Sequence, residues 1–211
     1  RNGDYLDPLE GKSYEAGLKG ELLGGRLNAS GAVFRTEQSN FAVVDTGFFV
    51  PGTTDPAFRT ADGVVVKGYE LELSGELAPG WDLAVGWTQF SAKDADGVDV
   101  AVDHSRRQLK VFSTYQLEGA WRGLSVGGGV SWEGDRPARA TNPVTGLEEK
   151  VGQPAFAIAE VMARYVFSDQ LSLQLNVFNL FDKKYRNGSW WGAPYTYGEP
   201  RRILVTGAYR F

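Results

Sequence analysis

The residues best suited to chemistry in this 211-residue chain are carboxylates, and one of them lies in a suggestive tripeptide. Asp45-Thr46-Gly47 is the tripeptide of aspartic proteases, whose mechanism needs two such carboxylates sharing one proton. The chain holds a single copy, and Phe48 stands where a small residue would be expected. We therefore interpret the tripeptide as an ordinary loop turn and not as half of a proteolytic site.

A second group of carboxylates lies in one loop and comprises Asp94, Asp96, Asp99 and Asp103. Clustered carboxylate oxygens are the ligands that Ca²⁺ prefers, but Gly97 is misplaced for an EF-hand and no closing glutamate follows. His104 is the only histidine, and the sequence around it offers no partners for a metal site or a nucleophilic triad. The pattern predicts a solvated loop, with no metal site and no catalytic residue in the chain.

Aromatic residues make the segment Tyr185–Arg202 the first candidate for binding. Rings offer a large contact area and hydrogen-bonding edges to a bulky amphipathic ligand, and nearby cations attract an anionic one. The rings and cations of interest in this segment are Trp190, Trp191, Tyr195, Tyr197, Arg201 and Arg202. Phe48 and Phe49, in another long connection, are the second candidates. The alternative is that these rings only pack within their loops or belong to an aromatic girdle.

Composition excludes several classes of protein. The net charge of −4 and the pI near 5.2 argue against nucleic-acid binding, which needs basic stripes. The absence of cysteine excludes disulfides and thiolate metal sites. No run of eighteen apolar residues could form a transmembrane helix. The chain opens Arg1-Asn2-Gly3-Asp4 without a methionine, so we interpret it as the interior of a longer gene product.

Nine segments alternate apolar and polar residues with period two, which is typical of β-strands with two different faces. In Gly68–Leu77, Leu71 and Leu73 fall on one face while Glu70 and Glu72 fall on the other. The nine segments start near residues 13, 26, 68, 81, 108, 124, 160, 171 and 202. We find no convincing amphipathic helix, so the sequence predicts an all-β protein.

The connections between these strands alternate strictly between long and short. The long ones cover about 37–63, 91–104, 133–153 and 181–200, and the short ones 24–25, 78–80, 118–123 and 168–170. Antiparallel up-and-down strands with long loops at one end and tight turns at the other are the layout of an outer-membrane β-barrel. A Greek-key sandwich would mix its loop lengths.

Three features favour lipid over a second sheet as the neighbour of the apolar face. The apolar face is one-sided in nearly every strand, and strands of about ten residues match the hydrocarbon thickness when tilted. Aromatic residues gather at strand ends, as they do in interfacial girdles. They are Tyr14, Trp81, Trp87, Tyr115, Trp132, Tyr165, Phe167, Tyr209 and Phe211. Because nine strands would leave open edges, which lipid does not tolerate, we expect the segment to form part of a barrel wall.

Four stretches resemble the C-terminal barrel of TonB-dependent ferric-siderophore receptors. They are "GKSYEAGLKGELLGGRLNASGAVFRTEQSN" (Gly11–Asn40), "VKGYELELSGELAPGWDLAVGWT" (Val66–Thr88), "RYVFSDQLSLQLNVFNLFDKKY" (Arg164–Tyr185) and "YGEPRRILVTGAYRF" (Tyr197–Phe211). The similarity runs from end to end. "NVFNLFDKKY" followed by a strand with an aromatic carboxy-terminus is typical of the family, and "YEAGLKGELL" and "YGEPR" of its siderophore branch.

The resemblance implies a 22-stranded barrel, integral to the bacterial outer membrane, whose last nine strands are residues 1–211 and whose N-terminal plug lies upstream. It implies capture of a ferric siderophore and TonB-driven import, with no enzymatic activity and with iron present only in the ligand. The implied partners are the siderophore, the TonB complex acting through the plug, outer-membrane lipid and the barrel-assembly machinery. Tyr209 and Phe211 would belong to the signal that this machinery reads.

Charged residues on the polar face would then line the lumen, where they either pair with the plug or face water. The lumen-facing charges that we expect to contact the plug are Glu70, Glu72, Lys110, Glu160, Arg164 and Arg202. Gly127 and Gly129 on the same face either leave room for the plug or serve local strand twist. Two alternatives to a transport receptor stay open at this point, namely a passive pore or small barrel and a soluble β-domain.

Overall fold

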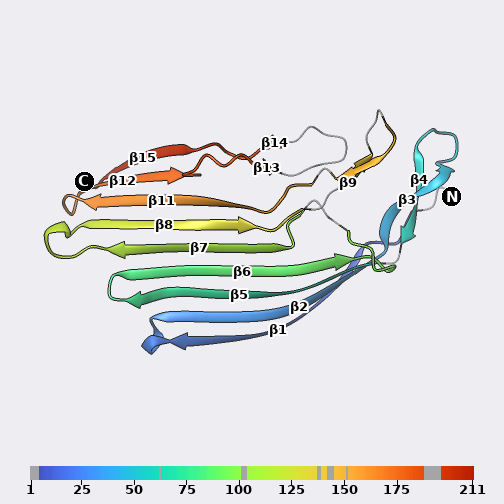
Figure 1. Cartoon of the computed structure of the whole chain (residues 1–211). Helices are drawn as coiled ribbons and strands as arrows, with labels where there is room; N and C mark the ends of the chain where they lie inside the picture. Colours follow the sequence, from blue (N-terminus) through green and yellow to red (C-terminus); the bar gives the residue numbers. More distant parts are fainter. Residues whose placement is uncertain are drawn as a thin grey trace. The chain divides into compact units, whose positions relative to one another are not determined.

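A computed structural model describes residues 5–61, 63–100, 104–136, 139–141, 145–150, 152–187 and 196–211. Its main element is an antiparallel sheet of nine strands, in which each strand neighbours the next main strand along the chain (Figure 1). In sheet order the strands are β1 (Glu10–Leu22), β2 (Leu27–Ser39), β5 (Val64–Ala78), β6 (Trp81–Lys93), β7 (Arg107–Gln116), β8 (Leu124–Glu133), β11 (Phe156–Val166), β12 (Leu171–Phe178) and β15 (Arg202–Tyr209). All nine predicted strands are confirmed.

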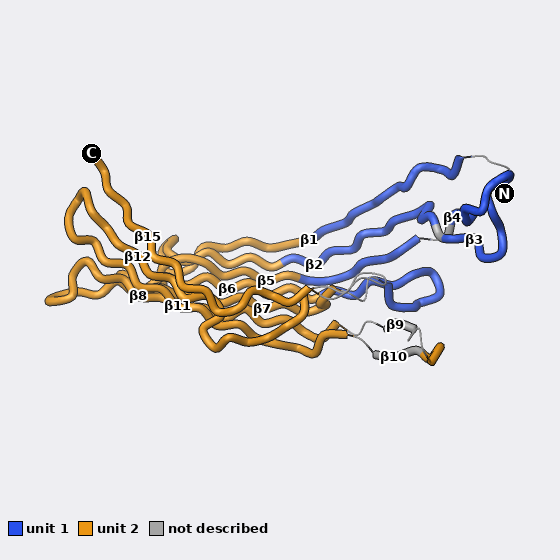
Figure 2. Tube along the Cα trace, turned by 90° about the horizontal axis from the view of Figure 1, so that it is seen from above, with its two compact units in different colours: residues 1–16, 32–69, 90–101 blue, residues 17–31, 70–89, 102–211 orange. Residues whose placement is uncertain are grey.

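The chain divides into two compact units (Figure 2). Unit 1 comprises Arg1–Ala16, Ala32–Tyr69 and Phe90–Ala101, and unit 2 comprises Gly17–Gly31, Glu70–Gln89 and Val102–Phe211. Strands β1, β2, β5 and β6 contribute to both units, whereas β7, β8, β11, β12 and β15 lie wholly in unit 2.

Strand register sorts the side chains of unit 2 onto two faces. Leu175 lies opposite Ala163 on β11 and Val205 on β15, so one face is apolar across three strands. Lys110 lies opposite Gly86 on β6 and Ser131 on β8, on the face that also carries Glu160. We call these the apolar face and the polar face. The period-two pattern of the sequence is thus realised in space, because every ladder pair joins residues of the same face.

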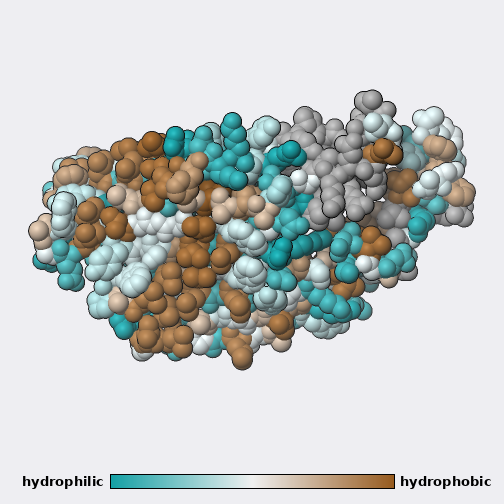
Figure 3. Space-filling model, viewed as in Figure 1, coloured by the Kyte–Doolittle hydropathy of each residue, from teal (hydrophilic) through white to brown (hydrophobic). Residues whose placement is uncertain are grey.

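The apolar face has no covering layer in the part of the chain that the structure describes. Its side chains are exposed along β8, β11, β12 and β15, and Figure 3 shows hydrophobic residues gathered in patches on the face of the molecule in view. The described residues hold a minimal core of buried apolar side chains, comprising Leu27, Ala57, Ala92 and Phe156. A soluble β-sandwich would bury this face against a second sheet, so the arrangement argues against the soluble alternative. Among the described residues, no helix is long and apolar enough to span a membrane.

Three of the predicted long connections contain short hairpins of their own. These are β3 (Phe41–Phe49) with β4 (Pro56–Ala61), β9 (Arg139–Thr141) with β10 (Glu148–Lys150), and β13 (Arg186–Asn187) with β14 (Thr196–Tyr197). In β3 the run Phe41–Val44 is rich in aromatic and β-branched residues, which favour extended backbone, and it pairs with Phe58–Ala61. Because the two strands of this hairpin hydrogen-bond to each other, the hairpin forms a separate two-stranded sheet without pairing with the main sheet.

One glycine of β5 is required by both its backbone conformation and its surroundings. Gly75 has a φ of +136°, and a Cβ atom at this position would collide with the backbone oxygen of Arg26, the residue just before β2. We therefore expect Gly75→Ala to destabilise the folded barrel by about 1 kcal/mol or more. Gly86→Ala is the matched control, because Gly86 has open space around its Cβ position. Denaturant titration of the parent barrel in vesicles measures both, and equal midpoints for the two variants would contradict this prediction.

Candidate functional site

The polar face of unit 2 carries a depression of about 420 Å³ that brings together three of the predicted lumen charges. Glu72 on β5, Lys110 on β7 and Glu160 on β11 all line it. Lys110 lies opposite two small residues, Gly86 and Ser131, and is exposed. The depression therefore offers a partner one cation and two carboxylates from three different strands.

Most of the predicted lumen charges have no ionic partner within the described part of the chain. Glu70, Glu72, Lys110, Glu160 and Arg164 make no ion pair or side-chain hydrogen bond with the residues described. Arg202 differs, because its Nε lies 3.4 Å from Glu199 Oε2 and its guanidinium lies 4.5 Å from the centroid of the Phe178 ring. The wall thus presents five charges whose partners must be water or another segment.

A second depression of about 440 Å³ lies on the same face and shares Glu72 with the first. Lys19 and Glu21 of β1 and Asn28 and Ser30 of β2 line it. Most of its lining side chains are polar, which suits water or a polar protein surface more than an apolar ligand. The two depressions thus extend the charged surface from β1 to β11.

Gly127 and Gly129 of β8 make room for their neighbours in the sheet. A Cβ atom at Gly129 would come within 2.6 Å of Phe112 on β7, and one at Gly127 within 2.8 Å of Thr114 and 3.2 Å of Met162. Side chains of β7 and β11 therefore lean over these glycines. Of the two alternatives that the sequence left open, room for a plug and local strand geometry, the contacts at these two positions favour the second.

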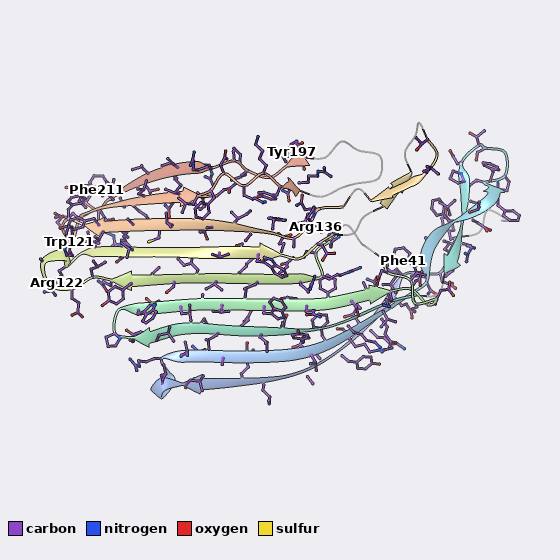
Figure 4. The ribbon with its side chains drawn as sticks, in the orientation of Figure 1. Phe41, Trp121, Arg122, Arg136, Tyr197 and Phe211 are labelled. Carbon is purple, nitrogen blue, oxygen red and sulfur yellow. The ribbon has the colours of Figure 1, made fainter. Side chains whose placement is uncertain are left out.

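The structure describes three of the six aromatic residues that we predicted to bind a ligand. Phe48 and Phe49 lie in β3, 44% and 59% exposed. Tyr197, labelled in Figure 4, lies in β14 and is 73% exposed. Trp190, Trp191 and Tyr195 lie outside the described residues. The three described rings are thus exposed to solvent in part and lie in two hairpins, β3–β4 and β13–β14.

A cluster that sequence reasoning missed lies at the loop end of unit 2. The rings of Phe156 and Tyr185 stack at 4.6 Å, and the Arg136 guanidinium lies 6.0 Å from the centroid of the Phe156 ring. Arg136 also forms an ion pair with Glu133, and its Nε is buried without a hydrogen-bond partner among the described residues. Phe156, only 5% exposed, is an aromatic residue on the polar face of β11, and that break in the pattern was the available signal.

The motif "NVFNLFDKKY" is a built turn at the end of β12. Asn179 is 4% exposed and has a φ of +49°. Its Nδ2 donates to the backbone oxygens of Lys183 (3.0 Å) and Glu199 (2.9 Å), and its Oδ1 accepts from the Lys183 amide (2.8 Å). Asp182 Oδ1 accepts from the Arg201 amide at 2.9 Å. The motif therefore closes the base of the last loop by hydrogen bonding across twenty residues.

The carboxylate motifs prove to be parts of turns and hairpins. In unit 1, Asp94 Oδ1 accepts from the amides of Asp96 (3.1 Å) and Val98 (2.9 Å), so this carboxylate caps its own turn. Asp45 is buried in β3 with Arg59 at 3.8 Å, at a register shift that includes Gly47. The tripeptide is thus a strand irregularity and not the loop turn that we predicted. Among the described residues, no three potential ligands gather as a metal site.

Exposed aromatic residues mark the turn end of the sheet in unit 2. Trp81 Nε1 donates to Ser113 Oγ at 2.8 Å, and the pairs Tyr165–Phe167 and Tyr209–Phe211 meet edge to face. Figure 4 places Trp121 and Phe211 at this end and Arg136 and Tyr197 at the other. An interfacial girdle needs such rings beside the apolar face. The role of Tyr209 and Phe211 in barrel assembly stays a prediction.

Comparison with known proteins places the chain among bacterial receptors. Residues 1–180 match the family described as "TonB dependent receptor-like, beta-barrel". The ferripyoverdine receptor of Pseudomonas aeruginosa is 38% identical over 209 residues, covering 98% of this chain and 26% of that receptor. The catecholate siderophore receptor Fiu of Escherichia coli is 31% identical over 224 residues, covering 100% of this chain and 27% of that receptor.

Solved structures agree with these relatives. The ferripyoverdine receptor of the P. aeruginosa outer membrane, bound to ferripyoverdine, superposes with a TM-score of 0.91 at 36% identity, covering 99% of this chain and 28% of that one. A complex of the receptor FpvAI with pyocin S2 gives a TM-score of 0.90 at 36% identity, covering 99% and 29%. The chain spans about a quarter of the length of the curated relatives it matches.

Proposed function

This chain belongs to the TonB-dependent receptor-like β-barrel family, and we propose that its parent protein imports a ferric siderophore across the bacterial outer membrane. The sheet forms part of the barrel wall, integral to the outer membrane, and its long connections form some of the capture loops. Import is driven by the TonB complex acting on a plug. The protein carries out no bond chemistry, and iron enters only as part of the ligand.

The observation that carries this proposal is the match to siderophore receptors along the whole chain. Relatives that cover 97% or more of the chain include receptors named for ferric pyoverdines, a metal–pseudopaline complex and catecholate siderophores. Nothing in these comparisons supports the passive-pore alternative. The uncovered apolar face supports a lipid-facing wall. As in outer-membrane barrels, each strand alternates exposed apolar side chains on one face with polar or charged side chains on the other.

The charges of the polar face that form no ion pair with other described residues support an interior partner. A plug seated against β5–β11 would meet Glu72, Lys110 and Glu160 in one depression, and charge complementarity requires it to present cations flanking an anion. Pairing would offset the desolvation of these groups when the plug excludes water. Glu70 and Arg164, on the same face, extend the surface, while Arg202 is already held by Glu199.

The first ligand to test is ferric pyoverdine, because the pyoverdine receptors include relatives 38% identical to this chain. The parent receptor, reconstituted in vesicles, is expected to bind ferric pyoverdine, and cells that carry it are expected to accumulate the iron only with an energised TonB complex. Catecholate and hydroxamate chelates serve as comparison ligands. Leakage of small solutes through the parent protein without TonB would instead indicate a pore.

The aromatic segment Tyr185–Arg202 is expected to carry much of the affinity. The double variant Trp190→Ala with Trp191→Ala should weaken ferric pyoverdine binding by roughly 30-fold or more, since a ring that anchors an interface contributes about 2 kcal/mol. Tyr165→Ala, at the turn end of β11, is the control and should bind as the unaltered receptor does. Quenching of receptor fluorescence measures the affinities, and unchanged affinity of the double variant would assign these rings to packing or to the girdle.

A further inference from the structure

Two of the long connections in unit 2 have separate closed bases. The connection of residues 134–155 is closed by two backbone hydrogen bonds, from the Arg136 amide to Gln153 (2.8 Å) and from the Gln153 amide to Arg136 (3.0 Å). The connection of residues 179–201 is closed by the Asn179 turn and by the Gly198 amide, which donates to the Tyr185 oxygen at 2.9 Å. The base of each connection is therefore closed by hydrogen bonds of its own.

Side chains nevertheless join the two bases to each other. The Arg186 amide donates to Gln153 Oε1 at 2.9 Å, a partly buried bond that crosses from one connection to the other. Gln153 Nε2 donates to the Pro154 oxygen at 2.8 Å, which holds the amide group with its oxygen toward Arg186. Arg186 lies four residues after Asp182 and four before Trp190, the first tryptophan of the connection.

A column of stacked groups crosses the same boundary. The Arg136 guanidinium lies over Phe156, Phe156 stacks on Tyr185, and the Tyr185 ring occupies the space that a side chain at Gly198 would need. The column thus joins two side chains at the ends of the first connection, Arg136 and Phe156, to Tyr185 of the second. Phe156 is almost fully buried within it, so the contact is packed and not incidental.

We propose that Gln153, Phe156 and Tyr185 are positioning residues, which couple the connection of residues 134–155 to the aromatic connection that captures the ligand. The proposal rests on the proposed function for its consequence, because the coupled connection carries Trp190, Trp191 and Tyr195. Ordering the aromatic connection before the ligand arrives lowers the conformational entropy that binding would otherwise cost. Contacts in one connection therefore set the affinity contributed by the other.

Amide hydrogen exchange in the whole receptor tests the coupling without any ligand. Gln153→Ala removes the partner of the Arg186 amide, so exchange at Arg186 should accelerate about two- to tenfold. Gln174→Ala is the matched control, because Gln174 bonds Asn176 on its own strand and should leave exchange at Arg186 unchanged. An unchanged rate at Arg186 in Gln153→Ala would contradict the link.

The reverse direction is tested from the other connection. Tyr185→Leu should accelerate exchange at the Arg136 and Gln153 amides, although Tyr185 bonds neither of them, because the Phe156 stack is lost. Tyr185→Phe keeps the ring and should retain the original rates, and Tyr165→Leu, at the turn end, controls for the loss of a ring elsewhere. Unchanged exchange at Arg136 and Gln153 in Tyr185→Leu would overturn the proposal, since the two connections would then open independently.

A binding measurement separates this inference from the proposed function. If the unaltered receptor binds ferric pyoverdine, Gln153→Ala should weaken binding more than Gln174→Ala does, and unchanged affinity would refute the positioning role. If the unaltered receptor binds none of the ferric chelates, the proposed function fails, while the exchange rates still decide whether the connections are coupled.

Discussion

Replacing Leu175 by arginine is expected to destabilise the folded barrel by about 2–4 kcal/mol, which is the cost of a cation on a lipid-facing strand near the bilayer midplane. Leu175 lies in the middle of β12, exposed on the apolar face between Ala163 and Val205. Lipid therefore surrounds the new side chain, and only snorkelling along the strand can bring its charge to water. The free energy of unfolding in phospholipid vesicles, from denaturant titration, measures the loss.

The adjacent residue supplies the control for this substitution. Gln174 points to the polar face, where its Nε2 bonds Asn176 Oδ1 at 3.0 Å. Gln174→Arg should cost much less than Leu175→Arg, because the cation then lies on the charged side of the wall. Equal losses for the two variants would mean that the apolar face does not meet lipid, and the wall assignment would be withdrawn.

Replacing Asn179 by alanine is the second change with a large expected effect, a loss of about 3 kcal/mol in folding stability. Alanine removes two hydrogen bonds to backbone oxygens and one from the Lys183 amide, and leaves these part-buried groups without their side-chain partner. The φ of +49° adds strain, because alanine adopts the left-handed region poorly. Denaturant titration of the parent barrel measures the stability, and amide exchange at residues 183–187 locates the loss.

Two further variants separate the causes. Asn179→Gly relieves the backbone strain but restores none of the hydrogen bonds, so it should recover only a minor part of the stability. Asn187→Ala, at an exposed position of β13, should change the stability by less than about 0.5 kcal/mol. Full recovery in Asn179→Gly would show that strain, and not hydrogen bonding across the loop base, explains the motif.

These expectations give the motif "NVFNLFDKKY" a physical role in the receptor. Its asparagine and aspartate hold Lys183, Glu199 and Arg201 at the base of the aromatic connection. The same connection is held from its other side by Gln153 and the Phe156–Tyr185 stack. A capture loop on a wall needs such a rigid base, because a ligand bound by mobile rings would have to order them first.

The nine strands and their two faces could be read from the amino-acid order. Alternation with period two is a local property of each strand, so Leu71 and Glu72 separate onto different faces whatever the neighbouring strand is. The alternation of long and short connections likewise lies in the order of residues, and it predicted the up-and-down layout that the strand order confirms. The motifs quoted from the sequence were sufficient to predict the family, and the family match over residues 1–180 confirms that prediction.

Contacts between strands and between loops needed the folded chain. Glu72, Lys110 and Glu160 share one depression only because the registers of five consecutive strands align them, and no local pattern encodes register over that span. The same is true of Phe156 and Tyr185, whose rings meet across two connections separated by β11 and β12. Side-chain direction follows from neighbouring residues, whereas the partner of each side chain follows from how distant segments pack.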